Sequence, residues 1–183
     1  MDGVGKLAEE PSSFFPCLQL DLLLKRTHRK TTERCLQGMS VPEKFFGRYQ
    51  LDKSENFDEF LSSKGVNWFV RQMIKLAGLT KVIGQNPEAG KYNMENLTSK
   101  KNTNYQGWEL GKQFEAPGLD GNQHQITFDF KDDVLSEHHI RLNEPETSAE
   151  TYFYTIDDNS QLVMKMENNG IVCRRWFKRV EQK

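Results

Sequence analysis

The stretch FFGRYQLDKSENFDEFLSSKG, Phe45–Gly65, joins a strand pattern directly to a helix pattern. From Phe46 to Leu51 the side chains alternate in character, which is the period of a β-strand. After Asn56, a candidate N-cap, apolar residues recur at the spacing of a helix. The sequence therefore predicts a strand that runs straight into a short helix.

That first helix is short and has one apolar face, formed by Phe57, Phe60 and Leu61, with Gly65 at the position of a C-terminal cap. A second helix is predicted to follow at once and to end at Gly78. Its apolar face is formed by Val66, Phe69, Val70, Met73, Ile74 and Ala77. Because helices of two or three turns are unstable alone, both must pack against the rest of the protein.

Beyond Gly78 the helical period disappears, and short β-like segments alternate with turn-forming residues. The segments are TKVIGQ, KYNMENLTSK, NYQGWELGKQFEA, HQITFDF, VLSEHHIRLN, ETYFYTID, QLVMKMEN and IVCRRWFKRV. The dipeptide Asn169-Gly170 is a strong hairpin signal. This order predicts an antiparallel meander, either closed as a barrel or stacked as a sandwich.

The last two segments show which residues face inward. Leu162, Met164 and Met166 fall on one face of the first segment. In the second, the face that carries Cys173 and Phe177 also carries Arg175. Burying a lone guanidinium costs several kcal/mol, so an inward Arg175 needs an anionic partner.

Composition and charge exclude several classes of protein. The chain has 183 residues, 36% of them hydrophobic and 28% charged, with a net charge of -1. This balance argues against electrostatic binding of nucleic acid and suits a sheet with one solvated face. Three cysteines without metal-ligand spacing predict neither a disulfide framework nor a metal site, and no cofactor is expected.

Residues 1–39 are predicted to be a poorly structured extension and residues 40–183 the folded domain. The apolar run FFPCLQLDLLL in the extension is shorter than the ~18 residues of a membrane span. It follows acidic residues and precedes basic ones, the reverse of a secretory signal. The extension is a signal, a splice-specific addition or a tail, and Met39 is a candidate internal start. We expect a cytoplasmic protein, with secretion as the alternative.

The stretch GRYQLDKSENFDEF resembles the opening signature of the fatty-acid-binding protein family, the intracellular lipid-binding proteins of the calycin superfamily. The residues that carry the resemblance are Gly47, Tyr49, Leu51, Asn56, Phe57, Asp58 and Phe60. The segments VRQMIKLAGLTK, MENLTSKKNT and ETYFY resemble the nematode branch. The resemblance covers residues 40–183.

The resemblance implies a mainly β fold: a ten-stranded antiparallel up-and-down β-barrel, lipocalin-like, with a helix-turn-helix lid. It also implies a non-enzymatic, monomeric lipid carrier that binds long-chain fatty acids or similar apolar carboxylates for solubilisation and transport. The alternative is a β-barrel interaction or structural module with a filled interior and no ligand. No catalytic triad, phosphate loop or pair of catalytic carboxylates stands out.

In the family, an Arg and a Tyr on the last strand hold the ligand carboxylate with a helper Arg. Arg175 matches the first, and Phe177 stands in place of the Tyr. The helper position falls near Tyr154 and Thr155, whose hydroxyls are candidate substitutes. The alternative is that Arg175 is satisfied by acidic side chains and water.

Two further groups of residues follow from the resemblance. The predicted cavity lining is Phe57, Phe60, Leu61, Val66, Met73, Ile74, Leu162, Met164, Met166 and Cys173. A predicted basic rim at the barrel mouth, able to touch anionic membranes, is formed by Lys64, Arg71, Lys75, Lys81 and Lys100, with Lys101 beside it.

Two other signals carry less weight. His138 and His139 are adjacent on a predicted strand, so they point to opposite faces and cannot share a metal. Asn96 begins a glycosylation sequon, which matters only if the chain is exported.

Overall fold

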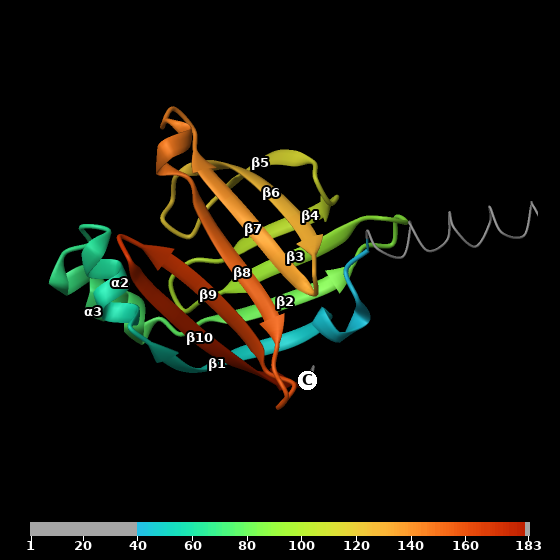
Figure 1. Cartoon of the computed structure of the whole chain (residues 1–183), viewed down its shortest axis with the longest axis horizontal. Helices are drawn as coiled ribbons and strands as arrows, with labels where there is room; N and C mark the ends of the chain where they lie inside the picture. Colours follow the sequence, from blue (N-terminus) through green and yellow to red (C-terminus); the bar gives the residue numbers. More distant parts are fainter. Residues whose placement is uncertain (1–39, 182–183) are drawn as a thin grey trace, which may run out of the picture. The chain divides into compact units, whose positions relative to one another are not determined.

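The computed structural model describes residues 40–181, which form a nearly closed barrel of ten antiparallel strands with two helices at one end (Figure 1). The predicted fold class is confirmed. The predicted extension over residues 1–39, including Met39, lies outside the described residues. The elements are η1 (Glu43–Phe45), β1 (Gly47–Glu55), α2 (Phe57–Ser63), α3 (Trp68–Leu76), β2 (Thr80–Gln85), β3 (Tyr92–Leu97), β4 (Thr103–Trp108), β5 (Gln113–Pro117), β6 (Gln123–Lys131), β7 (Val134–Arg141), η2 (Glu146–Ser148), β8 (Glu150–Ile156), β9 (Leu162–Asn168) and β10 (Ile171–Val180).

Strands that follow one another in sequence pair with each other, except β4 and β5, and β1 pairs with β10, so the sheet order is β4-β3-β2-β1-β10-β9-β8-β7-β6-β5. The two end strands, β4 and β5, are joined by side chains in place of a hydrogen-bonded ladder. The rings of Tyr105 on β4 and Phe114 on β5 lie with centroids 5.8 Å apart, and Trp108 on β4 stacks on Phe128 of β6 with centroids 4.1 Å apart. One backbone hydrogen bond, from Gly111 N to Phe128 O at 2.8 Å, lies beside them.

The segment NYQGWELGKQFEA, expected as one strand, forms two. A turn separates β4 from β5, with Lys112 N donating to Glu109 O at 3.2 Å. Gly111 lies in that turn with φ of +70°, a conformation that glycine adopts without strain. This division gives ten strands where the sequence pattern alone separated nine segments.

The strand alternation predicted for the last two strands is confirmed. Leu162, Cys173 and Phe177 are fully buried, and Met164 and Met166 are nearly so. Trp176 lies on the outer face, where Lys53 Nζ is 4.5 Å from its ring centroid. The inner faces of the strands therefore form the core of the barrel.

Helix α2 is packed on the barrel. Its Phe60 and Leu61 are buried, and it contacts β10 and β9. Asn56 occupies the predicted N-cap position, and its backbone O accepts from Phe60 N at 2.9 Å. Its side chain does not cap the helix, because the residue is in a left-handed conformation and its Nδ2 donates to Val172 O at 3.0 Å. Lys64, just after the helix, forms an ion pair with Glu150 on β8. These contacts fix α2 to the strands beneath it.

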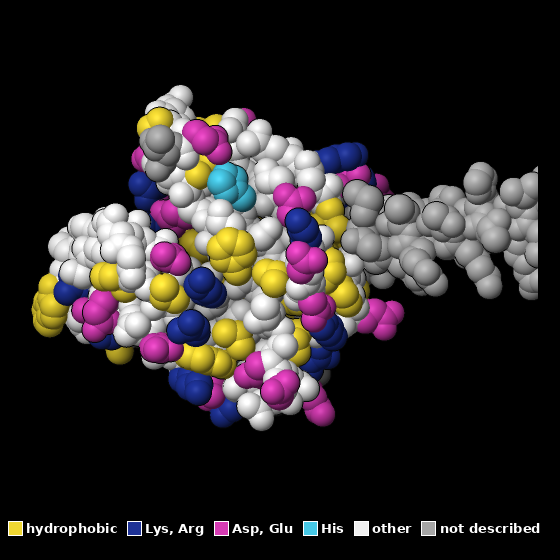
Figure 2. All heavy atoms as spheres, in the orientation of Figure 1, with side chains coloured by type: hydrophobic (Ala, Val, Ile, Leu, Met, Phe, Trp, Pro, Cys, Tyr) yellow, Lys and Arg dark blue, Asp and Glu magenta, His cyan; other side chains and the backbone are white. Residues whose placement is uncertain are grey.

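Helix α3 is packed less tightly. Asn67 caps it by accepting a hydrogen bond from Val70 N at 3.0 Å, but none of its residues is buried. Trp68, Phe69 and Leu76 are 65%, 67% and 82% exposed. Figure 2 shows hydrophobic side chains at the outer end of the two helices, next to charged side chains. Neither these helices nor any other in residues 40–181 has the length and hydropathy of a membrane span.

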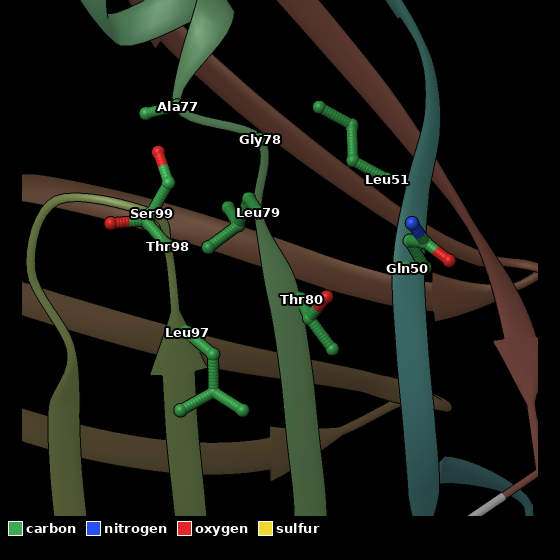
Figure 3. A pocket seen from close by; sticks show the side chains of 9 residues that line it. All are labelled: Gln50, Leu51, Ala77, Gly78, Leu79, Thr80, Leu97, Thr98 and Ser99. Atoms are coloured by element: carbon green, nitrogen blue, oxygen red, sulfur yellow. The ribbon is translucent and has the colours of Figure 1, made fainter.

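The linker from α3 to β2 borders an indentation of about 350 Å³ that Figure 3 shows from close by. It lies beside the beginning of β2 and extends to Gln50 and Leu51 on β1. The linker residues Ala77, Gly78 and Leu79 line it.

Candidate functional site

A cavity of about 300 Å³ lies beneath α3. Its lining is mostly apolar, with one buried charge, Arg175. The lining residues are Phe69, Val70, Met73, Ile74, Ala77, Gly78, Leu79, Thr98, Lys100, Lys101, Leu119 and Arg175. The cavity shares the linker Ala77–Leu79 and Thr98 with the indentation in Figure 3, so the start of β2 borders both spaces.

Arg175 is inward-facing and 7% exposed. Its Nε donates to Ser54 Oγ at 3.2 Å, and its guanidinium carbon lies 4.0 Å from the centroid of the Phe57 ring. A guanidinium has five N–H donors, so this hydrogen bond leaves four for a ligand. Phe57, at the start of α2, thus holds the anchor instead of lining the cavity.

The charge of Arg175 is destabilised by its surroundings. Burial lowers the pKa of Arg175 to about 10, and the nearby groups that offset this are Cys173 and Tyr154. Within residues 40–181 no acidic side chain forms an ion pair with Arg175. The alternative in which acidic side chains satisfy Arg175 therefore has no contact to support it among the described residues.

The three other residues predicted to contact the ligand head group are Phe177, Tyr154 and Thr155, and within the described chain only the first lies next to Arg175 without another polar partner. Phe177 is fully buried, and its ring centroid is 5.8 Å from the guanidinium carbon of Arg175. Tyr154 is also fully buried, but its hydroxyl donates to Glu137 Oε2. Thr155 pairs with Val163 on the outer face of the sheet, so its prediction as a head-group helper is wrong.

A buried polar cluster that the sequence analysis missed lies near these residues. Glu137 on β7 is 2% exposed, and its Oε1 lies 2.8 Å from His139 Nε2. Burial raises the pKa of Glu137, but this effect is outweighed by favourable electrostatic interactions with His139 and Lys81 and by the Tyr154 hydrogen bond. The net result is a pKa of about 2. Glu137 is therefore an anion inside the barrel. The alternation of Leu135, Glu137 and His139 within VLSEHHIRLN was the signal that could have revealed it.

Lys81 belongs to this interior, and its prediction as part of the basic rim is wrong. It is 4% exposed, and its Nζ donates to Asn96 Oδ1 at 2.6 Å. Asn96 Nδ2 in turn donates to Thr103 Oγ1 at 2.9 Å. Lys81 was placed on the rim because of its position just after the lid, but it shares the inward face of β2 with Ile83.

The remaining rim residues are largely neutralised. Lys64 pairs with Glu150, while Arg71 and Lys75 approach Asp58 to 3.3 and 3.4 Å. Lys100 is exposed and lines the cavity mouth, as does Lys101. The rim is therefore less basic than its sequence suggests.

Of the residues predicted to line the cavity, Met73 and Ile74 border the cavity beneath α3. The others are part of the apolar core around it. These are Phe57, Phe60, Leu61, Val66, Leu162, Met164, Met166 and Cys173. Phe69, Leu79 and Leu119 line the cavity without having been predicted to do so.

The two weaker signals can now be placed. His139 faces inward, whereas His138 lies outside with Nδ1 2.9 Å from Thr151 Oγ1, so the two do point to opposite faces. In the described part of the chain no cluster of three His, Cys, Asp or Glu side chains could hold a metal. Asn96 is 3% exposed, and a glycan on it could not fit inside the barrel.

Comparison with known proteins places this site in a family. No family model matches the chain. The chain is 92% identical to "Fatty acid-binding protein homolog 4" of Caenorhabditis elegans over 145 residues, which cover 79% of the chain and 100% of that protein. It belongs to the fatty acid-binding protein family.

Other members of the fatty acid-binding protein family are also similar to this chain in sequence and structure. "Fatty acid-binding protein homolog" of Ascaris suum is 45% identical over 148 residues, covering 79% of the chain and 89% of that protein. The solved structure of As-p18, described as an extracellular fatty acid binding protein, is 44% identical and superposes with a TM-score of 0.74. The match covers 77% of this chain and 99% of As-p18. The resemblance noted in the sequence, nematode relatives included, is confirmed.

Proposed function

We propose that this protein carries one long-chain fatty acid, or a similar apolar carboxylate, with the alkyl chain in the cavity beneath α3 and the carboxylate on Arg175. The observation that carries the proposal is a buried guanidinium that lines an apolar cavity and has no acidic partner within residues 40–181. A carboxylate can pair with two guanidinium N–H groups at once.

The balance of interior charge supports a monoanionic ligand. Among the described residues, the Lys, Arg, Asp and Glu side chains buried at 7% exposure or less are Lys81, Arg175 and Glu137, and a protonated His139, also 7% exposed, would only add positive charge. Two cations and one anion leave an excess positive charge in a low-dielectric space, where an uncompensated charge is costly. A bound carboxylate removes this excess, whereas an alcohol does not.

The alkyl chain supplies most of the affinity. Burial of each methylene contributes about 0.8 kcal/mol, so a C16 chain contributes on the order of 12 kcal/mol. Association and ordering cost about 4 kcal/mol or more. A clamp reduced to Arg175 therefore still leaves a favourable binding free energy, with the guanidinium orienting the ligand.

Displacement of a fluorescent fatty acid tests the carrier function. Oleate should displace the probe at low micromolar concentration or below, with one molecule bound per chain by native mass spectrometry. A protein that gives no saturable probe binding, and retains no lipid in native mass spectra, would instead be the structural module with a filled barrel. The apolar cavity beneath α3 argues against that alternative.

The exposed face of α3 suggests where ligand passes to and from a membrane. Trp68, Phe69 and Leu76 project from the helix that covers the cavity, and Lys100 lies at the cavity mouth. Apolar side chains flanked by basic ones suit an anionic bilayer surface. We infer that the lid contacts such a surface during transfer.

Transfer rates to vesicles test this contact. Leu76→Ser should slow transfer to vesicles that contain phosphatidylserine and leave the Kd for oleate unchanged. Phe153→Ser is the matched control, because Phe153 is 41% exposed on β8 and belongs neither to the lid helices nor to the cavity lining. Equal transfer rates for the two variants would contradict membrane contact through α3.

We further infer that the barrel domain, residues 40–183, functions as a monomer, separately from the extension over residues 1–39, and that it is not an enzyme. Support comes from the C. elegans relative, whose full length aligns with 145 residues of this chain. A cytoplasmic location remains the proposal, and secretion the alternative, since As-p18 is described as extracellular. Cell fractionation combined with mass spectrometry of the native N-terminus tests both points.

A further inference from the structure

Lys81 is a buried amine that the proposed fatty-acid anchor does not use. It lies on β2, between Tyr49 on β1 and Asn96 on β3, and is 4% exposed. Its Nζ donates one hydrogen bond, to Asn96 Oδ1 at 2.6 Å, and lies 5.0 Å from the centroid of the Tyr154 ring. An ammonium has three N–H donors, so these contacts do not use all of its capacity.

The surroundings of Lys81 favour its neutral, nucleophilic form. Burial and the positive charge of Arg175 lower the pKa of Lys81 to about 8, although Glu137 opposes the shift. At pH 7 about a tenth of the amine is then unprotonated, compared with less than about a thousandth for an ordinary lysine. Desolvation and a neighbouring cation are the two features that activate lysines for attack on carbonyl carbons.

Two residues that line the cavity are neighbours of Lys81, although Lys81 is not itself a lining residue. Leu79, the residue just before β2, lines the cavity and lies two positions before Lys81 in the chain. Arg175, whose charge lowers the pKa of Lys81, lines the same cavity. An alkyl chain in the cavity would therefore have its polar end at Arg175, and an aldehyde group there is offered to the interior that holds Lys81.

The polar cluster around Glu137 supplies a counter-ion and proton acceptors for an imine at Lys81. A protonated imine buried in a barrel requires a counter-ion. Glu137 is a buried carboxylate whose negative charge raises the pKa of Lys81 without a direct ion pair between the two described side chains. Glu137 is also hydrogen-bonded to the Tyr154 hydroxyl and lies 2.8 Å from His139 Nε2. These groups can accept and return the proton that moves while the carbon–nitrogen bond forms.

We propose that Lys81 binds long-chain aliphatic aldehydes covalently and reversibly, as a protonated imine paired with Glu137. The Lys81 ammonium first passes one proton to Glu137, and the freed Nζ electron pair forms a bond to the aldehyde carbon while the carbonyl π bond opens onto oxygen. The oxygen then takes up one proton from Nζ and the one held by Glu137, the carbon–oxygen bond breaks, and water leaves. The net reaction converts ammonium and aldehyde into iminium and water, without a redox step and without a change in charge beside Glu137. The proposal rests on the proposed function in one respect: the same cavity must accept an alkyl chain.

Reductive trapping tests the site in the full chain. The protein is incubated with hexadecanal and cyanoborohydride at pH 7, and the adducts are mapped by peptide mass spectrometry. Lys81 should be alkylated at least about tenfold more than the exposed Lys53, given its larger unprotonated fraction. Lys81→Arg should abolish this adduct while keeping a positive charge, and the matched Lys53→Arg should leave it unchanged. Glu137→Gln should reduce the yield several-fold, because the iminium loses its counter-ion.

A competition arm keeps the test decisive if Lys81→Arg fails to fold. Saturating oleate should suppress the Lys81 adduct in the unmodified protein and leave Lys53 labelling unchanged. Alkylation spread evenly over exposed lysines, with none at Lys81, would overturn the inference. Fluorescent fatty acid binding measured in the same samples separates the two proposals: binding without a Lys81 adduct refutes imine formation alone, whereas absence of both refutes the carrier function.

Discussion

Arg175→Leu should move stability and fatty-acid affinity in opposite directions. The guanidinium is buried without an acidic partner in the described chain, so its charge costs free energy while the cavity is empty. The same charge becomes favourable when a carboxylate binds. Leucine removes both effects at once and fits an apolar surrounding that includes Phe57 and Phe177.

The two magnitudes follow from the structure. Burial lowers the pKa of Arg175 from 12.5 to about 10, which corresponds to roughly 3 kcal/mol against the charged form. Contact with the Phe57 ring at 4.0 Å returns about 1–2 kcal/mol. The ligand-free variant should therefore gain about 1–2 kcal/mol in free energy of unfolding. A charge-assisted hydrogen bond contributes about 1.5–3 kcal/mol, so oleate affinity should fall roughly 10- to 100-fold.

Urea unfolding of the delipidated protein measures the first effect, and displacement of a fluorescent probe by oleate and by oleyl alcohol measures the second. Arg174→Leu is the matched control, since Arg174 is the next residue, points outward and lies 3.6 Å from Glu55. It should leave both quantities nearly unchanged. If Arg175→Leu lowers stability and weakens acid and alcohol equally, Arg175 is a structural residue and the anchor argument is wrong.

Three other predictions concern the barrel interior. The pKa of Glu137 is about 2 in the folded state and 4.5 ordinarily, so its contribution of ~3 kcal/mol to the free energy of unfolding should be complete above pH 4.5 and disappear as the pH falls towards 2. Glu137→Gln should therefore remove the fall of the urea midpoint between pH 4.5 and pH 2. If the variant keeps the same fall in this pH range, the assignment of Glu137 as a buried anion is wrong. Cys173 is fully buried, and burial raises the pKa of its thiol to about 11, so the thiol should be unreactive in the folded protein. In a variant with Cys17 and Cys35 replaced by Ser, thiol reagents should label Cys173 at the rate of global unfolding. Fast labelling of the native variant would show that reagents reach the interior at this position. Asn96 is 3% exposed, so a chain glycosylated there should not close its barrel. When the protein is directed into a secretory pathway, peptide mass mapping should find no glycan at Asn96 in the fraction that binds fatty acid. A glycosylated fraction that binds fatty acid normally would refute the inward position of Asn96.

The parts of the fold that the sequence predicted are those with strong local patterns. The alternation around Arg175 placed it inside the barrel, because a single register satisfies the apolar residues Cys173 and Phe177 on either side of it. The change from strand to helix period after Asn56 likewise located the lid. Asn56 holds the predicted N-cap position, but its side chain does not cap the helix, because its Nδ2 donates to Val172 O on β10.

The parts that could not be predicted depend on contacts between distant strands. Lys81 is inside because Asn96, Tyr154 and Glu137, from three other strands, surround it. No local pattern contains that information, since a lysine beside a lid is ordinarily solvated. The gap between β4 and β5 was hidden for a similar reason: the segment that forms both strands shows continuous strand character.

The aromatic contacts across the gap between β4 and β5 have a consequence for the range of lipids the protein can hold. In the described chain, Trp108 on β4 stacks on Phe128 of β6, and Tyr105 on β4 packs against Phe114 on β5. Separating β4 from β5 therefore breaks side-chain packing and the isolated hydrogen bond from Gly111 N to Phe128 O, where other strand pairs would lose a ladder. Elsewhere, widening the wall would rupture whole ladders of amide pairs. The barrel should therefore widen most easily between β4 and β5. Bulky or bent lipid chains should be accommodated by separation of the aromatic rings there, while the hydrogen-bonded strand pairs stay in place.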